Sequence, residues 1–211
     1  MHLVFLGPPG SGKGTQAKAL ADKLKIAHIS TGDVLRNEIK MATELGLLAK
    51  SFMDMGELVP DDLMLKMIKD ILQKKPDGFI FDGFPRTAAQ AEGLENLLNE
   101  LGKQIDAVIY LTAKDEDLLK RLQGRYYCAD CDLDYNINTR PPKMAGICDS
   151  CGEKLRQRSD DTDEVILHRL DVYRERTKPV EEFYRLRGLL KEIDGSQPPD
   201  RVTSLVMGAV G

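Results

Sequence analysis

The chain has 211 residues, 42% of them hydrophobic, so it can bury a substantial core as one ordinary domain with insertions. Its 30 basic and 34 acidic residues give a formal net charge of −4, which argues against a general nucleic-acid or membrane-surface binder and requires any anion site to be local. The longest strongly apolar stretch, residues 105–113, is far shorter than the roughly 20 residues that span a bilayer, and the start MHLVFLGPPG has no basic segment or cleavage site, so we expect a cytoplasmic protein.

Short apolar runs alternate with helical patterns along the chain. HLVFL (2–6) leads into a Gly-rich loop, and TQAKALADKL follows with apolar residues at helical spacing. Further apolar runs are GFIFD (78–82), AVIYL (107–111) and LLKEI (189–193), separated by helical stretches such as TAAQAEGLENLLNEL and DEDLLKRL. This alternation predicts an α/β fold with a doubly wound parallel sheet flanked by helices.

Two segments interrupt the alternation. Residues 30–59 are mostly helical in pattern, whereas residues 126–163 begin with a stretch that is rich in Cys, Pro, Gly, Asp and Tyr and lacks helical periodicity. We expect both to be insertions over the ligand edge of the sheet.

The strongest chemical signal is GPPGSGKGT, residues 7–15, between the first predicted strand and the first predicted helix. Its glycines let backbone N–H groups turn inward around phosphate oxygens, and Lys13 can reach the β and γ phosphates. A plain Gly-rich turn is the alternative, which the full G-x-x-x-x-G-K match in this context disfavours. Gly14 stands where most such loops have Ser or Thr, and Thr15 comes one place later, which weakens the case for direct magnesium binding by that hydroxyl.

Four cysteines form two C-x-x-C pairs separated by sixteen residues: Cys128, Cys131, Cys148 and Cys151. In a reducing compartment such pairs are metal ligands more often than disulfides, and their spacing suits a tetrahedral thiolate site. Because sulfur fills all four positions, we expect a structural zinc rather than a catalytic one. Iron in the same cage and four free thiols are the alternatives.

GPPGSGKGT, with STGDVLR (30–36), DGFPRTAAQ (82–90) and RSDD (158–161), resembles the motifs of the adenylate kinase family of nucleoside monophosphate kinases. The resemblance covers the whole chain, and the cysteine segment is similar to the long lid of bacterial-type members. It implies a P-loop kinase core that transfers the terminal phosphoryl group of MgATP reversibly to AMP, giving two ADP. It also implies an AMP-binding insertion at 30–59 and a lid with a structural metal at 126–163.

The resemblance implies four groups of site residues. The catalytic cations would be Lys13, Arg86, Arg121, Arg158 and Arg169, because forked guanidinium donors fit phosphate oxygens. ATP contacts would come from Gly10, Ser11, Gly12, Lys13, Gly14, Thr15, Arg121, Arg125, Asp134, Tyr135 and Gln197. AMP contacts would come from Thr31, Arg36, Glu57, Leu58, Val59, Gly83, Phe84, Pro85, Arg86, Gln90, Arg158 and Arg169, with the Gln90 amide on an adenine edge. Asp82 and Thr15 would organise magnesium through its water shell.

Some positions depart from the family pattern or lie outside it. Family members often follow the lid tyrosine with His, whereas Asn136 follows Tyr135 here, and Asp134 is acidic where a small or apolar neighbour of ATP is usual. We interpret His28 and His168 as structural. Arg185 and Arg187 are interpreted as solvated surface charges.

Two other functions stay open at this point. One is a kinase that phosphorylates UMP, CMP or GMP, although Thr31 and Gln90 favour AMP. The other is a nucleotide-dependent module whose cysteine segment grips nucleic acid. Residues 124–158 hold six Lys or Arg against five Asp or Glu, so they form no basic stripe and we expect no nucleic-acid or membrane partner. One compact lobe with two flaps predicts a monomer.

Overall fold

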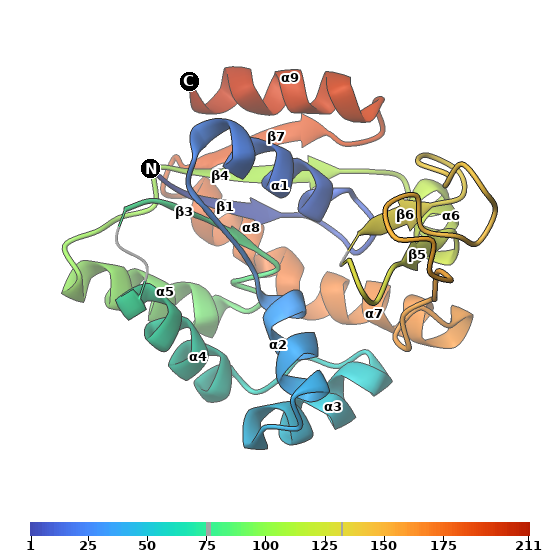
Figure 1. Ribbon diagram of the computed structural model, residues 1–211. Helices are drawn as coiled ribbons and strands as arrows, with labels where there is room; N and C mark the ends of the chain where they lie inside the picture. Colours follow the sequence, from blue (N-terminus) through green and yellow to red (C-terminus); the bar gives the residue numbers. More distant parts are fainter. Residues whose placement is uncertain (75–76, 132) are drawn as a thin grey trace.

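The computed structural model describes residues 1–74, 77–131 and 133–211. Within these residues a five-stranded sheet has the order β2-β3-β1-β4-β7, with every neighbouring pair parallel (Figure 1). The strands are β1 (His2–Leu6), β2 (Ala27–Ser30), β3 (Phe79–Asp82), β4 (Ala107–Thr112) and β7 (Leu190–Asp194). The predicted parallel α/β architecture is therefore confirmed, and β2 is an additional strand that the apolar runs did not indicate.

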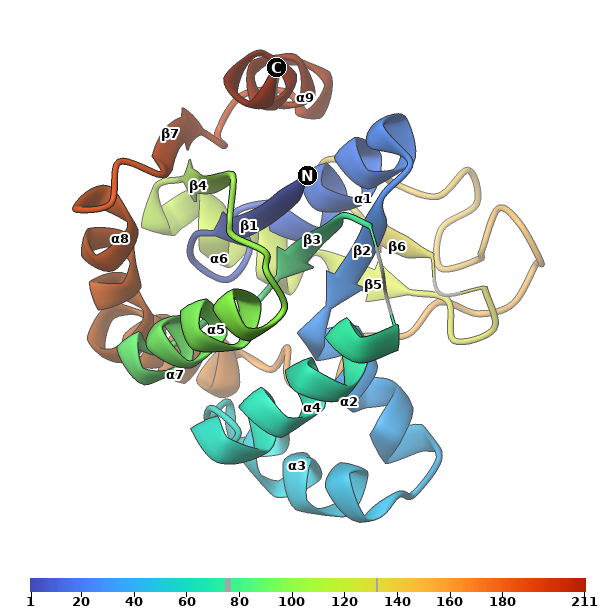
Figure 2. The same ribbon diagram turned by 90° about the vertical axis from the view of Figure 1, so that its left-hand side faces the viewer.

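Helices cover both faces of this sheet (Figures 1 and 2). The helices α1 (Lys13–Leu24) and α9 (Pro199–Val210) lie on one face, and α4 (Asp61–Lys74), α5 (Ala88–Glu100) and α8 (Lys178–Arg185) lie on the other. Along β1, Leu3 and Phe5 pack toward α1 and α9, while Val4 and Leu6 pack toward the opposite layer. Because both faces are buried, the inner strands β1, β3 and β4 are nearly continuous apolar runs, whereas the edge strands β2 and β7 are more polar.

Residues 30–59 form a helical pair outside the sheet, α2 (Thr31–Lys40) and α3 (Glu44–Met55). The Ser30 hydroxyl caps α2 by accepting from the backbone N–H of Asp33 at 3.3 Å, and Thr43 caps α3 in the same way. The two helices approach closely at Gly46, where an added Cβ would lie 2.2 Å from the carbonyl oxygen of Glu38. Only glycine fits this crossing, so the pair is held at a fixed angle.

The cysteine segment, residues 126–163, projects beyond the carboxyl ends of the central strands, away from the helical pair (Figure 1). It contains the antiparallel pair β5 (Arg125–Tyr127) and β6 (Asp134–Asn136), and its small core is built on Cys128, Tyr135 and Cys148. Before it comes α6 (Asp115–Gln123), and after it comes α7 (Asp163–Val172), which packs against α6. A π-helical turn, Tyr173–Thr177, joins α7 to α8.

The carboxyl ends of β1, β2 and β3 meet at one edge of the sheet, between the helical pair and the cysteine segment. Ligands of open α/β sheets bind at this edge. In the part of the chain that the structure describes, no helix has the length and apolarity needed to cross a membrane.

Candidate active site

The loop after β1 has the shape that phosphate binding requires. Gly7, Gly10 and Gly12 have φ angles of +140°, +83° and +95°, which residues with a side chain rarely adopt. At Gly7 an added Cβ would lie 2.4 Å from the carbonyl oxygen of Leu111, so the loop is pressed against β4. The Ser11 hydroxyl is buried and has no hydrogen-bond partner among the described residues. Helix α1 begins directly after the loop and aims its N-terminus into it.

Lys13 lies over this loop. Its Nζ donates hydrogen bonds to the carbonyl oxygens of Gly7 at 2.7 Å and Pro8 at 2.9 Å. Burial lowers the pKa of Lys13 to about 7, against the opposing influence of the Asp82 carboxylate. Thr15 is exposed in the first turn of α1. An anion that enters the loop would therefore raise the pKa of Lys13 and favour its charged form.

Asp82 ends β3 beside the loop. An added Cβ on Gly14 would lie 3.1 Å from Asp82 Oδ2, so the glycine at this unusual position leaves room for the carboxylate. His28, interpreted as structural, has its Nε2 3.5 Å from the same oxygen, and this nitrogen is buried without a hydrogen-bond partner among the described residues. Asp82 thus lies between the phosphate-binding loop and β2.

The DGFPR turn orients Arg86. Gly83 has φ +77°, and its carbonyl oxygen accepts from Arg86 Nε at 2.8 Å and from Thr31 Oγ1 at 2.9 Å. The peptide bond between Phe84 and Pro85 is cis. Burial, followed by repulsion from Arg169, lowers the pKa of Arg86 to about 10, so its guanidinium stays charged at neutral pH. The turn therefore aims one buried cation at the sheet edge.

The other predicted AMP contacts lie around this turn. Gln90 is buried, and its Oε1 accepts from the backbone N–H of Arg86 at 2.8 Å. Arg36 pairs with Asp33 on its own helix. Glu57 Oε1 lies 2.8 Å from Nε2 of His168, a partner that sequence reasoning did not indicate for this histidine. An open pocket of about 380 Å³ lies alongside, with a lining that includes Leu58 and Val59.

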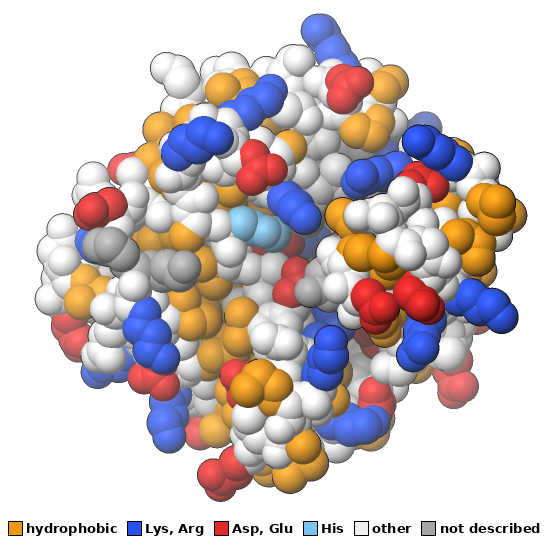
Figure 3. All heavy atoms as spheres, in the orientation of Figure 1, with side chains coloured by type: hydrophobic (Ala, Val, Ile, Leu, Met, Phe, Trp, Pro, Cys, Tyr) orange, Lys and Arg blue, Asp and Glu red, His pale blue; other side chains and the backbone are white. Residues whose placement is uncertain are grey.

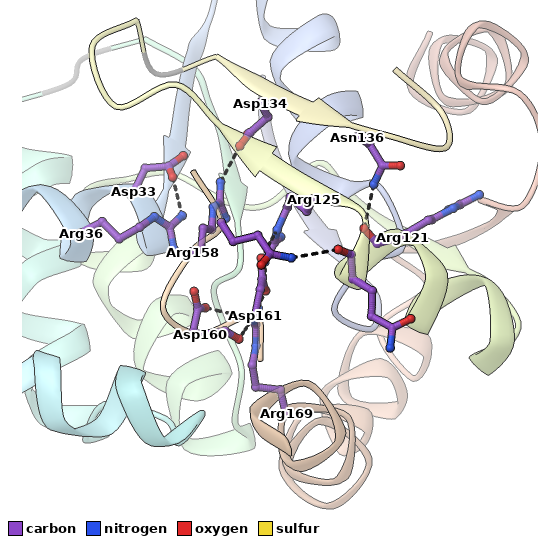
Figure 4. Close-up of polar contacts among 12 residues, drawn as sticks. Asp33, Arg36, Arg121, Arg125, Asp134, Asn136, Arg158, Asp160, Asp161 and Arg169 are labelled. Atoms are coloured by element: carbon purple, nitrogen blue, oxygen red, sulfur yellow. Dashed lines mark hydrogen bonds and ion pairs between the residues drawn. The ribbon is translucent and has the colours of Figure 1, made fainter. Parts of the chain in front are cut away.

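Two arginines meet on one buried aspartate (Figure 4). Asp161, whose side chain is 0% exposed, accepts from Arg125 Nε at 2.7 Å and Nη2 at 2.6 Å. Its Oδ1 also accepts from Arg169 Nη1 at 2.9 Å, and the neighbouring Asp160 pairs with the same arginine nitrogen. These carboxylates fix two guanidinium groups contributed by the cysteine segment and by α7.

Two further arginines are held by contacts across the site (Figure 4). Arg158 Nη2 donates to Asp134 Oδ1 at 2.8 Å, and Arg121 Nη2 donates to the carbonyl oxygen of Gly195 at 2.9 Å. The Asn136 amide donates to the backbone carbonyl of Arg121 at 2.7 Å, which ties β6 to the end of α6. Gln197 donates to Asp194 in the loop that also holds Arg121. Arg121 Nη1 also donates to the carbonyl oxygen of Ser11 at 3.4 Å, so Arg121 connects the segment 194–197 with the phosphate-binding loop.

The electrostatics of the site indicate an anionic ligand. Burial, together with the other arginines around it, lowers the pKa of Arg158. Burial also lowers the pKa of Arg169, against the pull of Asp160. Burial alone would raise the pKa of Asp160, but Arg169 and Arg125 outweigh it and the pKa is lowered. In Figure 3 basic, acidic and histidine side chains gather around a hollow in the middle of this face. Phosphate groups are suitable ligands for such a cluster of arginine side chains, because their oxygens accept the paired hydrogen bonds of guanidinium groups.

The cysteines form a separate cluster at the far side of the segment 126–163. Their four Sγ atoms all lie within 4.8 Å of one another, the only such His, Cys, Asp or Glu group found among residues 1–74, 77–131 and 133–211. Tyr135, predicted to contact ATP, has its hydroxyl 3.5 Å from Cys148 Sγ and accepts from the backbone N–H of Asp149. That hydroxyl lowers the pKa of Cys148 to about 6, which favours the thiolate. The side chain of Tyr135 thus supports the cluster.

Three acidic residues in the site escaped the sequence analysis. Asp160 and Asp161 were present in the RSDD motif, but only their pairing with two arginines gives them a purpose. Asp61 accepts a hydrogen bond from Gln90, and no motif marked it. Sequence spacing alone does not report such partners, since Asp161 pairs with arginines of β5 and α7, and Asp61 on α4 pairs with a glutamine of α5.

Comparisons with known proteins agree with this geometry. The family model described as adenylate kinase matches residues 5–189. A protein from Methanocella arvoryzae named adenylate kinase is 49% identical over 100% of this chain and 98% of its own length. One of the same name from Lachnospira eligens is 47% identical over the full length of both chains, and one from Archaeoglobus fulgidus is 48% identical over 93% of this chain and 92% of its own.

Proposed function

Given that the chain belongs to the adenylate kinase family and catalyses reversible phosphoryl transfer between ATP and AMP, we propose that the donor MgATP binds at the phosphate-binding loop and the acceptor AMP at the 30–59 insertion. The observation that carries the proposal is the convergence of Lys13, Arg86 and the arginines of residues 121–169 on one sheet edge. Phosphoryl transfer needs in-line positioning and neutralised charge more than covalent help, and this edge supplies both.

On the donor side, the β and γ phosphates lie in the loop of residues 7–15. Their oxygens replace the carbonyl oxygens of Gly7 and Pro8 as the hydrogen-bond acceptors of Lys13. Arg121 reaches the same phosphates from α6, and its link to Gly195 brings Gln197 beside the nucleotide. The remaining donor contacts are Gly10, Ser11, Gly12, Gly14, Thr15, Arg125, Asp134 and Tyr135. The buried Ser11 hydroxyl, which has no partner among the described residues, supports this assignment, because a buried polar group needs a hydrogen-bond partner and a phosphate oxygen can provide one.

On the acceptor side, Arg86 and Arg169 hold the phosphate of AMP, and Gln90 contacts its base. Thr31, Arg36, Gly83, Phe84, Pro85, Arg158 and the segment Glu57–Val59 complete the pocket. Support comes from the shared carbonyl of Gly83, which joins Thr31 to Arg86 and so couples the insertion to the turn after β3. Two nucleotides facing each other across Arg86 place the γ phosphate of one near the α phosphate of the other.

Residues 126–163 act as a lid. Arg125 and Arg158 lie at its two ends, so closing it brings both to the phosphates and expels water, which would otherwise accept the phosphoryl group. Asp161 holds Arg125 and Arg169 in place before the nucleotides arrive. Their charges are then stabilising at the transition state without reorganisation of the site.

Magnesium fits the carboxylate at the end of β3. Asp82 lies against Gly14 and near Lys13, where it can hold waters of a hydrated ion, and Thr15, the residue after Gly14, is exposed. Magnesium supplies charge neutralisation of the donor phosphates when bound.

The cysteine cluster fits a structural zinc. Sulfurs about 2.3 Å from a tetrahedral metal lie about 3.8 Å apart, which the spread of the four Sγ atoms accommodates. All four positions are thiols, so none is left for water or substrate. Iron suits the same ligands and is the alternative. We further propose a cytoplasmic monomer, supported by nucleotide sites built from a single chain and by cysteines arranged as ligands.

The test is a coupled assay that presents ATP with AMP, UMP, CMP or GMP in turn. We expect efficient turnover with AMP and rates lower by orders of magnitude with the pyrimidine monophosphates. Arg86→Ala is expected to reduce turnover severely with normal circular dichroism, whereas Arg185→Ala, on the exposed end of α8, serves as the matched control. Equal rates with AMP and UMP would contradict the acceptor assignment.

A further inference from the structure

The side-chain amide of Gln90 is fixed by two opposed partners. Its Oε1 accepts from the backbone N–H of Arg86 at 2.8 Å, and its Nε2 donates to Asp61 Oδ1 at 2.8 Å. Asp61 is the first residue of α4, and its other oxygen accepts from Thr87 Oγ1 at 3.0 Å. The Thr87 hydroxyl in turn accepts from the backbone N–H of Gln90 at 3.1 Å, which caps α5. These contacts form a closed set that we call the amide lock.

The amide lock permits one orientation of the amide. A backbone N–H only donates and an ionised carboxylate only accepts. Turning the amide of Gln90 by 180° would set Nε2 against the N–H of Arg86 and Oε1 against the carboxylate of Asp61. Both hydrogen bonds would be lost and both new contacts would be repulsive. Since Gln90 is 1% exposed, water does not compensate them.

The fixed orientation matters for the choice of base. After its two bonds, the amide retains one N–H and one lone pair. The Watson–Crick edge of adenine offers the 6-amino group as donor and N1 as acceptor. Guanine and hypoxanthine offer the reverse, with the 6-carbonyl oxygen as acceptor and N1–H as donor. An amide of Gln90 that is fixed in one orientation can pair with the 6-aminopurine edge. Pairing with the 6-oxopurine edge requires the amide to turn over, so that Oε1 and Nε2 change places.

We propose that Asp61 is a positioning residue that selects 6-aminopurine over 6-oxopurine monophosphates by fixing the amide of Gln90. The proposal rests on the proposed function, which puts the base of AMP at Gln90. Asp61 itself need not touch the nucleotide, because its influence passes through the orientation of one neighbouring side chain.

The decisive variant is Asp61→Asn, which keeps the shape and offers either a donor or an acceptor to Gln90. The probe is inosine monophosphate, because hypoxanthine lacks the 2-amino group that would add a steric effect to guanine. We expect the ratio of kcat/KM for AMP to that for inosine monophosphate to fall by about tenfold or more, with the KM for ATP unchanged. Asp62→Asn is the matched control, since it removes the same charge from the same turn of α4 at an exposed position. It should keep the parent ratio.

Gln90→Ala separates the two levels of the argument. If it lowers the ratio, and Asp61→Asn lowers it only while Gln90 is present, the amide lock selects the base. If Gln90→Ala lowers the ratio but Asp61→Asn does not, the lock is wrong and the acceptor site stands. If Gln90→Ala leaves the ratio unchanged, the base does not lie at Gln90, and the lock and the acceptor assignment fail together.

A measurement on the parent protein covers the case in which Asp61→Asn does not fold. The Nε2 proton of Gln90 that is donated to Asp61, identified among the signals that Gln90→Ala loses in ¹H–¹⁵N spectra, should exchange slowly with solvent. Rapid exchange in the folded parent would overturn the lock.

Discussion

Lys13 is the residue whose charge depends most on what occupies the phosphate-binding loop. In the unfolded chain its pKa is near 10.5, and burial lowers it to about 7 in the folded protein. Between these two values the unfolded chain holds a proton that the folded protein has released, so this lysine makes the free energy of unfolding rise with pH across that window. Bound phosphates oppose the effect, because they stabilise the charged form.

The first prediction follows from that linkage. At about pH 8.5, binding of a non-hydrolysable ATP analogue should take up close to one proton, because the phosphates return Lys13 to its charged form. Calorimetry in buffers of different ionisation enthalpy measures the uptake. In Lys13→Met it should be absent. Equal uptake by both proteins would assign the proton to another group.

The second prediction concerns turnover. Lys13→Met should lower kcat by about 10²–10³-fold, the cost typical of removing one group that stabilises transition-state charge. The circular dichroism should stay normal, because the hydrogen bonds that Lys13 donates go to carbonyl oxygens of its own loop. Lys18→Met, on the exposed side of α1, is the control. A Lys13→Met enzyme within tenfold of the parent would rule out this role.

At the scale of elements, the lid depends on its cysteines for a core. Its buried apolar cluster consists of little more than Cys128, Tyr135 and Cys148, and its strands β5 and β6 are three residues each. Such a segment has too little buried surface to fold alone. The proposed metal, held by four thiolates, would therefore supply most of its stability.

The third prediction tests that dependence. Cys148→Ser should weaken metal binding and lower the melting temperature, yet retain appreciable activity at temperatures where the variant is folded, because the four Sγ atoms cluster on one another, whereas Arg125 and Arg158 are held by Asp161 and Asp134. Elemental analysis, calorimetry and rates at low temperature are measured on the same preparations. Two results would contradict this: a parent without stoichiometric metal, or a folded variant that is inert at every temperature.

The elements also mark how far sequence patterns reach. The runs at 2–6, 78–82 and 107–111 became the inner strands, which are largely buried on both faces and therefore nearly continuously apolar. The run at 189–193 became the edge strand β7, in which only Ile193 is buried. Strand β2, AHIS, was missed because it is short and Ile29 is its only buried residue. The phosphate-binding loop was predictable from its fixed spacing, whereas Asp61 and Asp161 act across distances in the chain that no local pattern records.

At the scale of the whole molecule, the insertion and the lid region already touch. Ser159 donates to Asp54 at 3.2 Å, and His168 pairs with Glu57 at 2.8 Å. These exposed contacts are weak individually. They join the end of α3 and the residues just after it to two places: Ser159, which follows Arg158, and His168, which precedes Arg169 on α7. Filling both nucleotide sites should therefore stabilise one closed arrangement.

The fourth prediction is that an analogue joining two adenosines through five phosphates binds about 10²–10⁴-fold more tightly than ATP. Occupying the first site makes binding at the second intramolecular. The melting temperature should rise accordingly. Titration calorimetry measures the affinities, with the triphosphate-linked analogue, too short to span both sites, as control. Affinity no better than that of ATP would mean that the second site is absent.

The position of β7 has a consequence for biosynthesis. The ribosome delivers β1 to β4 first, and until β7 emerges the edge of β4 from Val108 to Thr112 presents unpaired backbone groups that other nascent chains can join. The side chain of Gln16 on α1 likewise has its hydrogen-bond partners, the Pro199 carbonyl oxygen and the Thr203 hydroxyl, on α9, which is synthesised last. Arg121 gains its anchor at Gly195 in the same late interval. A chain that still lacks the segment from Leu190 onward therefore has an open sheet edge and an unanchored Arg121, and we expect aggregation during synthesis to decrease when this segment is completed faster.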